Sequence, residues 1–285
     1  MYASYWNIKS TPFLPGFDCK FVYLGPHYDE AIARFRFLAE SCRLAGIIVG
    51  PPGTGKTTIM REVMHLADRP AAGSLLVDAP GNGSLAMANY IFHHFKVGQG
   101  SYASLAEAEL DITSRVAAST GQADRALLCI DNAHNLADEQ GLHLIRFLID
   151  LRSPSTKAKP EQPLFTVFLS GNTNLAESVR NNPDVRERIQ LFYSLAPLSK
   201  EESTAYIQHH MRAAGGDLWV FSEDALNALY EFGRGIPRRI NLLCDTSLML
   251  GFAAKAECIN RAIVTQAATD TGMIKLEPDG RENNS

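Results

Sequence analysis

One motif restricts this chain more than any other feature of its sequence. Residues 50–57 read Gly-Pro-Pro-Gly-Thr-Gly-Lys-Thr and fit the spacing G-x-x-x-x-G-K-[ST] of a phosphate-binding loop. The run before it, Ala45–Val49, is apolar and partly β-branched, which predicts a buried strand. From Thr57 to Ala67, apolar side chains recur at helical spacing, which predicts a helix. A strand, a glycine-rich loop and a helix in this order are the context that the motif requires.

The residue types of the loop suit a polyphosphate. Glycines let the backbone approach an anion with its N–H groups pointing inward, and the helix N-terminus adds partial positive charge. Lys56 is expected to reach the β- and γ-phosphates, and Thr57 to ligate Mg²⁺. The sequence therefore predicts ATP and Mg²⁺ as cofactors, with the nucleotide held by Gly50, Pro51, Pro52, Gly53, Thr54, Gly55, Lys56, Thr57 and Thr58.

The first two thirds of the chain alternate apolar strands with amphipathic helices. Further strands are expected at Ser74–Asp78, Ala126–Ile130 and Phe165–Leu169. This alternation predicts the α/β class, a P-loop parallel sheet flanked by helices. The helices are expected at about Pro26–Ser41, Ser84–Lys96, Ser104–Ser119 and Asp138–Asp150, with Ser84 and Ser104 as caps.

After about Pro197 the pattern predicts helices alone. Ser199 and Glu202 fit a capping box at the start of the first of them. We expect three parts: residues 1–196 as an N-terminal segment plus the α/β nucleotide-binding domain, 197–273 as a small helical lid, and 274–285 as a disordered tail. The lid helices are expected at Ser199–Ala214, Ser222–Phe232, Pro237–Ala254 and about Asn260–Thr271.

Composition sets broad limits on location and partners. The 285 residues carry a net charge of -4, which gives no general attraction to nucleic acid. The five cysteines form no C-x-x-C pair, which favours reduced thiols and a cytoplasmic protein. The N-terminus lacks the features of a signal peptide, and no apolar run approaches the roughly 20 residues of a membrane span.

Asp131 closes the strand at 126–130 and is the candidate for the second half of the nucleotide site. A carboxylate there would hold Mg²⁺ directly or through water, whereas the alternative is an ordinary turn residue. Many related ATPases place a glutamate next, but this chain has Asn132, and an amide cannot accept a proton from water at neutral pH. Glu139, the nearest later acid, is expected two turns into the next helix. The sequence thus predicts secure nucleotide binding and slow hydrolysis of ATP to ADP and phosphate.

Four further side chains are candidates for contact with the phosphates. Asn172, after the strand at 165–169, could contact the γ-phosphate or the attacking water, or could simply form a turn. Arg186 and Arg188 could act in trans on a neighbour's nucleotide, or be solvated surface residues. Arg238 stands with Arg239 at the start of a helix, where a cation is unfavourable, and this suggests an anion nearby.

With these pieces assembled, the chain resembles the AAA+ ATPases of the ExeA/GspA type, which are associated with general (type II) secretion. The similarity covers about residues 1–272. It includes the segment Phe21–Leu24, the stretch Leu128–Leu136, Arg188-Ile189 before the lid, and the most family-specific block, Gly235–Asp245. The resemblance implies a soluble motor or switch that binds ATP between the two domains and at a subunit boundary, and that assembles into rings or filaments.

The resemblance also implies roles for individual residues. It points to Asn172 as sensor 1, Arg238 after Pro237 as sensor 2, and Arg188 as the arginine finger; Tyr23 borders the adenine or packs in the core. Three features depart from the family: Asn132 replaces the usual glutamate, Phe192 stands where a second arginine is expected, and the membrane span and wall-binding region of the secretion members are not expected here.

Two other functions remain open. The first is an ATP-dependent DNA-binding regulator, similar to the AAA+ proteins that select targets for transposition, in which Lys157 and Lys159 of the loop 152–163 line a DNA channel; the alternative is a solvated loop. The second, motivated by Asn132, is a scaffold that holds ATP without hydrolysing it.

Overall fold

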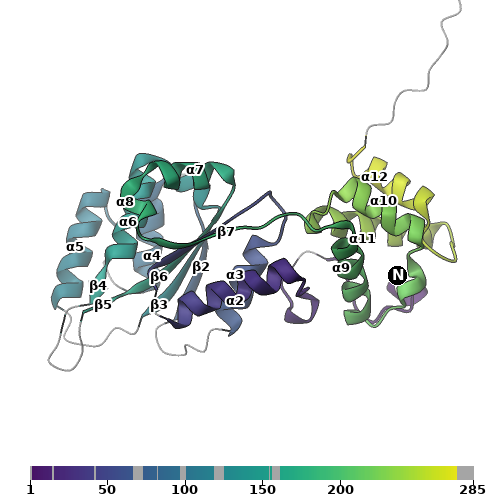
Figure 1. Ribbon diagram of the computed structural model, residues 1–285, viewed down its shortest axis with the longest axis horizontal. Helices are drawn as coiled ribbons and strands as arrows, with labels where there is room; N and C mark the ends of the chain where they lie inside the picture. The colour runs from purple at the N-terminus through teal and green to yellow at the C-terminus, as the bar shows by residue number, and fades with distance from the viewer. Residues whose placement is uncertain are drawn as a thin grey trace, which may run out of the picture. The chain divides into compact units, whose positions relative to one another are not determined.

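The computed structural model describes residues 2–14, 16–41, 43–66, 73–81, 83–96, 101–118, 125–153, 155 and 161–274. Its contacts divide the chain into two compact units (Figure 1). The sheet unit comprises Pro26–Pro52 and Lys56–Ala196, and the helical unit comprises Met1–Gly25, Gly53–Gly55 and Pro197–Ser285, each as far as it is described. The two units are taken one at a time below.

The sheet unit is built on five parallel strands in the order β2-β3-β6-β1-β7. This arrangement confirms the predicted fold class, a P-loop parallel sheet flanked by helices. Because the strands are parallel, their carboxyl ends share one edge of the sheet, which is where ligands bind in open α/β folds. The strands are β1 (Ala45–Val49), β2 (Ser74–Asp78), β3 (Ala126–Asp131), β6 (Phe165–Gly171) and β7 (Ile189–Ser194).

The edge strand β7 was not predicted from the sequence. It pairs with β1, but several of its residues remain partly or fully exposed, among them Gln190 and Ser194. A strand at the edge of a sheet is covered less completely, and β7 lacks the apolar run by which the other four strands were found.

Helices cover both faces of the sheet. On one face, α4 (Ser84–His94), α5 (Leu105–Ala118), α6 (Glu139–Asp150) and α7 (Thr173–Asn181) form a common core with alternate strand residues. On the other lie α2 (Pro26–Glu40) and α3 (Lys56–Leu66), as Figure 1 shows. There Phe35 packs edge-on against Phe168 with ring centroids 4.9 Å apart. The short elements are α8 (Pro183–Arg186), η2 (Ala133–Leu136) and the paired strands β4 (Arg152–Ser153) and β5 (Gln162–Pro163).

Side-chain caps begin several helices, and the one predicted at Ser104 is among them. The Asp138 carboxylate accepts the N–H of Gly141 at 2.8 Å, and the Ser104 hydroxyl accepts the N–H of Glu107 at 3.2 Å. The expectation for Ser84 was wrong: Ser84 is the first residue of α4, and Gly83, at φ 99°, takes the N-cap position without a side-chain bond. That backbone conformation is one that glycine adopts without steric cost.

The helical unit contains the four helices that the sequence predicted: α9 (Lys200–Ala213), α10 (Glu223–Gly233), α11 (Pro237–Ala253) and α12 (Arg261–Asp270). The capping box of Ser199 and Glu202 is present at the start of α9. The short 3-10 segment η3 (Leu218–Val220) lies between α9 and α10.

Residues 2–25, with α1 (Tyr2–Tyr5) and η1 (Cys19–Phe21), belong to the helical unit. The sequence had grouped them with residues up to 196. The buried indole N–H of Trp6 donates to the carbonyl of Leu248 at 2.9 Å, and the Tyr2 hydroxyl donates to the Asp245 carboxylate. These contacts, which join residues more than 240 positions apart, tie the start of the chain to α11.

In the part of the chain that the structure describes, no helix is long and apolar enough to cross a lipid bilayer.

Candidate nucleotide-binding site

The phosphate-binding loop joins the carboxyl end of β1 to the start of α3. Gly53 and Gly55 have φ values of 84° and 95°, so both use backbone conformations that are open to glycine and strained for other residues. Between them, the Thr54 side chain is fully buried. The glycines at positions 53 and 55 are therefore required by the path of the backbone.

Lys56 is held over this loop. Its ammonium donates to the carbonyl oxygens of Gly50 at 2.8 Å and Pro51 at 2.9 Å. A phosphate oxygen is a stronger acceptor than a neutral carbonyl because the hydrogen bond is charge-assisted on both sides. The ammonium is thus at the position from which it can exchange loop carbonyls for a bound phosphate.

Asp131 collects donors from three neighbouring segments. Its carboxylate accepts the Thr57 hydroxyl of α3 at 2.5 Å, the Ser170 hydroxyl of β6 at 2.7 Å and the backbone N–H of Asn132 at 2.9 Å. A hydroxyl and a carboxylate oxygen beside the phosphate loop are ligands that suit Mg²⁺. The residues present therefore fit the predicted metal site of Thr57 and Asp131.

Ser170 was missed by the sequence reasoning, which selected Asn172 two residues later. Ser170 is fully buried, and its hydroxyl points at Asp131 because β6 lies directly beside β3. In the sequence, its signal is limited to a hydroxyl residue that directly follows the apolar run at 165–169.

Asn132 sits at the turn that follows β3. Its φ of 49° and ψ of 33° are left-handed, a conformation that Asn tolerates better than most residues. Its side-chain amide donates to the Asp78 carboxylate at 2.8 Å. Asp78 ends β2 and pairs with Asp131 in the register of the sheet, so the sheet places a second carboxylate beside Asn132. Glu139 lies in the first turn of α6, and among the described residues it makes no hydrogen bond to this cluster.

Asn172 is the N-cap residue of α7. Its side-chain oxygen accepts the N–H groups of Asn174 at 3.0 Å and Leu175 at 3.3 Å. The oxygen is thus engaged in capping, and the role of sensor 1 remains a prediction that would use the amide nitrogen.

Residues 40–179 match the family model of the AAA domain. This segment is therefore similar to AAA domains. Its limits enclose the phosphate loop, Asp131 and Ser170. The chain is 26% identical over 280 residues, 97% of its length, to general secretion pathway protein A of Aeromonas hydrophila, which confirms the resemblance to AAA+ ATPases of the ExeA/GspA type. The match spans 50% of that protein, so this chain covers about half of the relative's length.

A second relative is an uncharacterized HTH-type transcriptional regulator of Methanocaldococcus jannaschii. It is 24% identical over 151 residues, which are 52% of this chain and 35% of that protein.

Solved structures share the fold. The ORC1 protein of Aeropyrum pernix, solved in complex with DNA, has a TM-score of 0.67 at 16% identity over 91% of this chain and 68% of that one. Cdc6p of Pyrobaculum aerophilum has a TM-score of 0.65 at 16% identity over 90% and 71%. The RuvB Holliday junction branch migration motor of Thermotoga maritima has a TM-score of 0.55 at 18% identity over 85% and 66%.

The structure places the two candidate arginine fingers away from the phosphate loop. Arg186 ends α8 and Arg188 directly precedes β7, so both lie at the amino edge of the parallel sheet. Lys56 follows β1 at the opposite, carboxyl edge. Neither arginine is therefore brought together with the loop of its own chain.

Arg188 is fixed by two acceptors. Its Nε donates to the Asp150 carboxylate at 2.6 Å, and a terminal nitrogen donates to the Asp184 carbonyl at 2.5 Å. The hydrogen bond to Asp150 raises the pKa of Arg188. Arg186 is exposed and forms no ion pair among the residues that the structure describes. Phe192, where a second arginine was expected, lies on β7 with the Arg180 guanidinium 5.7 Å from its ring centroid.

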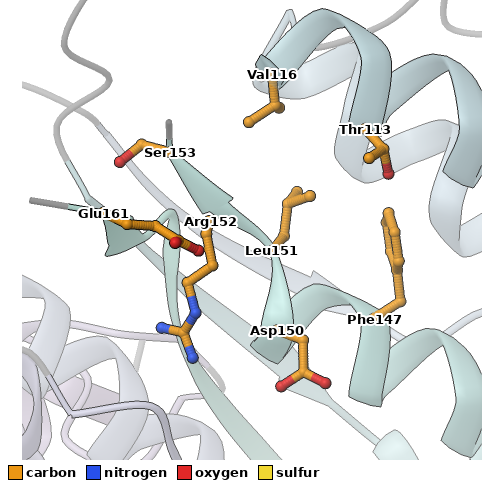
Figure 2. A pocket seen from close by; sticks show the side chains of 8 residues that line it. All are labelled: Thr113, Val116, Phe147, Asp150, Leu151, Arg152, Ser153 and Glu161. Atoms are coloured by element: carbon orange, nitrogen blue, oxygen red, sulfur yellow. The ribbon is translucent and has the colours of Figure 1, made fainter. Parts of the chain in front are cut away.

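The surface of the sheet unit has a pocket beside Asp150, the hydrogen-bond partner of Arg188. Figure 2 shows side chains of α5, α6 and the β4–β5 segment around this pocket. Since residues 150–153 precede β6, the pocket lies at the amino edge and is separate from the phosphate loop. It is lined by Thr113, Val116, Phe147, Asp150, Leu151, Arg152, Ser153 and Glu161.

Besides Gly53–Gly55 of the phosphate loop, three predicted site residues lie in the helical unit. The Tyr23 ring packs edge-on against Tyr206, with centroids 5.7 Å apart, and burial raises its pKa. Pro237 and Arg238 are the first two residues of α11. Lys157 and Lys159, and nearly all of the tail at 274–285, lie outside the described residues.

Proposed function

We propose that this chain is an ATPase that binds Mg-ATP on its phosphate loop. The observation that carries the proposal is the convergence of Lys56, Thr57 and Asp131 at the carboxyl edge of the sheet. Lys56 would hold the β- and γ-phosphates, while Thr57 and Asp131 would hold Mg²⁺, which when bound neutralises charge on the transferring phosphoryl group. Backbone N–H groups of Gly53 and Gly55 would complete the cradle.

We further propose that the site is completed by other parts of the assembly. Tyr23, Pro237 and Arg238 of the helical unit would contact the nucleotide. An arginine of a second copy, Arg188 or Arg186, would also reach the nucleotide. The amino-edge position of both arginines is consistent with this, because any contact they make with a phosphate would have to be with a neighbour's nucleotide. The protein would therefore work as a homo-oligomer, a ring or a filament.

The role that best fits the sequence is a cytoplasmic motor or switch of the ExeA/GspA type. Support comes from the 97% of this chain that aligns with general secretion pathway protein A. The link to secretion is itself a proposal, because the match covers only 50% of general secretion pathway protein A. Nucleotide state would control a protein partner, and Asn132 would keep turnover slow.

A second candidate is an ATP-dependent DNA-binding regulator. Support comes from the names of similar proteins: an HTH-type transcriptional regulator and an ORC1 protein solved in complex with DNA. The net charge of -4 argues against broad affinity for DNA, so contact would need a local basic patch. A third candidate, an ATP-bound scaffold, rests on Asn132 alone.

ATP hydrolysis by the purified protein, measured with and without duplex DNA while light scattering follows assembly, tests these candidates. Assembly with ATP that ignores DNA supports the motor or switch. Turnover or assembly stimulated by DNA supports the regulator. Tight ATP binding without turnover under either condition supports the scaffold. The variant K56A, run in parallel, identifies any activity that does not come from this site.

A further inference from the structure

Hydrolysis at this site needs a proton acceptor, and the sequence analysis identified none. When water attacks the γ-phosphorus it loses a proton, and a positioned carboxylate is the usual acceptor. Asn132 stands next to Asp131, but an amide accepts no proton at neutral pH. Both oxygens of Asp131 are engaged, one by Thr57 and the other by Ser170 and the N–H of Asn132. Asp131 is therefore committed to its own hydrogen bonds and to the metal.

The structure supplies a different carboxylate, on the neighbouring strand. Asp78 ends β2 opposite Asp131, and its Oδ1 accepts the side-chain amide of Asn132 at 2.8 Å. The backbone fixes this arrangement, because the Ala79 N–H donates to the Asp131 carbonyl at 2.8 Å. The Asn135 amide in turn donates to the Ala79 carbonyl at 2.8 Å. Asp78 is also exposed, so water can reach it.

The left-handed backbone at position 132 suits an asparagine. At φ 49° a glutamate would carry a steric cost that Asn largely avoids. The amide of Asn132 then acts as a donor that holds Asp78 toward the carboxyl edge of the sheet. The pair keeps one carboxylate and one amide at this edge, with the carboxylate on β2.

We propose that Asp78 is the general base of the ATPase and that Asn132 positions it, an inference that rests on the ATPase function proposed above. The water oxygen bonds to the γ-phosphorus, and the bond from that phosphorus to the β–γ bridging oxygen breaks, its electron pair leaving with ADP. The proton of the water passes to the Asp78 carboxylate, which later returns it to solvent. Atoms and charge balance with ATP and water as the sole reactants.

The test compares D78N with wild type in two separate assays, equilibrium binding of a fluorescent ATP analogue and single-turnover hydrolysis of labelled ATP. The variant keeps the size of the side chain and the oxygen that accepts from Asn132. We expect hydrolysis to fall by about 10²-fold or more, while the Kd for the nucleotide changes less than about threefold. The matched control is E139Q, which removes an exposed carboxylate from the first turn of α6 and is expected to leave the rate unchanged.

Asn132 has its own prediction as a positioning residue: N132A should lower kcat by about tenfold and leave KM unchanged, because the base would remain but lose its orientation. If D78N does not fold, as judged by circular dichroism, D78S carries the same comparison.

The possible failures are distinct. A D78N variant that hydrolyses ATP at more than a third of the wild-type rate would overturn the role of Asp78 and leave the ATPase function intact. Wild-type protein that binds ATP without any turnover would likewise overturn it and favour the scaffold. Wild-type protein that binds no nucleotide would remove the proposed function itself, and the base with it.

Discussion

The hydrogen bond from Ser170 to Asp131 offers a direct test of how the metal-side cluster is built. Ser170 is fully buried at the end of β6, and its hydroxyl lies 2.7 Å from a carboxylate oxygen. S170A removes this donor and leaves the Asp131 oxygen with only the N–H of Asn132.

The expected cost follows from the charge of the acceptor. A hydrogen bond to a charged group contributes about 1.5–3 kcal/mol to stability, more than a bond between neutral groups. For a unit of this size, each kcal/mol lowers the melting midpoint by about 2–4 °C. S170A should therefore lower the free energy of unfolding by about 1.5–3 kcal/mol and the midpoint by about 3–12 °C.

The matched control lies on the same strand. Thr166 is also buried, and its hydroxyl has no hydrogen-bond partner among the described residues. T166V keeps the shape and removes the unpaired hydroxyl, so it should be neutral or stabilising. Urea and thermal unfolding followed by circular dichroism distinguish the two. Equal unfolding midpoints for S170A, T166V and wild type would refute the claim that Ser170 supports the acidic cluster.

Two further predictions concern the helical unit and the proposed subunit boundary. Burial lowers the pKa of His210 to about 4, between the stacked rings of Phe13 and Phe21. As the pH drops, the imidazole of His210 is protonated in the unfolded state before it is protonated in the folded state. The free energy of unfolding should therefore fall by up to about 1.4 kcal/mol per pH unit between about pH 6.5 and pH 4. Urea titrations across this range should show a shallower fall for H210F, and equal slopes would contradict the assignment. For the boundary, R188A should lose ATP turnover, by about 10³-fold if Arg188 is the finger. Mixing R188A with K56A should restore turnover in trans. If R186A loses ATP turnover and R188A keeps it, Arg186 is the finger instead.

Much of the fold was predictable because the buried strands carry their signal in a few consecutive residues. The runs at 45–49, 126–130 and 165–169 are apolar because both faces of a central parallel strand are covered. The half-exposed β7 carries no such run. The packing of residues 2–25 with the helical unit could not be predicted from the sequence either, since it depends on long-range contacts such as the one from Trp6 to Leu248.

The candidate site, like the fold, was predictable only in part. The phosphate loop and Asp131 were found because each follows a recognisable strand in the sequence. Ser170 and Asp78 were not, because their importance depends on which strands are neighbours and in what register. The left-handed backbone of Asn132 is likewise a property of the folded turn. Once the strand order is known, the carboxyl ends of β2, β3 and β6 identify the missing residues.

The central claim is that the loop at 50–57 binds Mg-ATP, and calorimetric titration of the purified protein with ATP tests it most directly. We predict saturable binding near one ATP per chain that weakens when Mg²⁺ is removed and is lost in K56A, with E139Q unchanged as the control. Absence of binding by the folded wild-type protein, or equal affinity in wild type and K56A, would contradict the account.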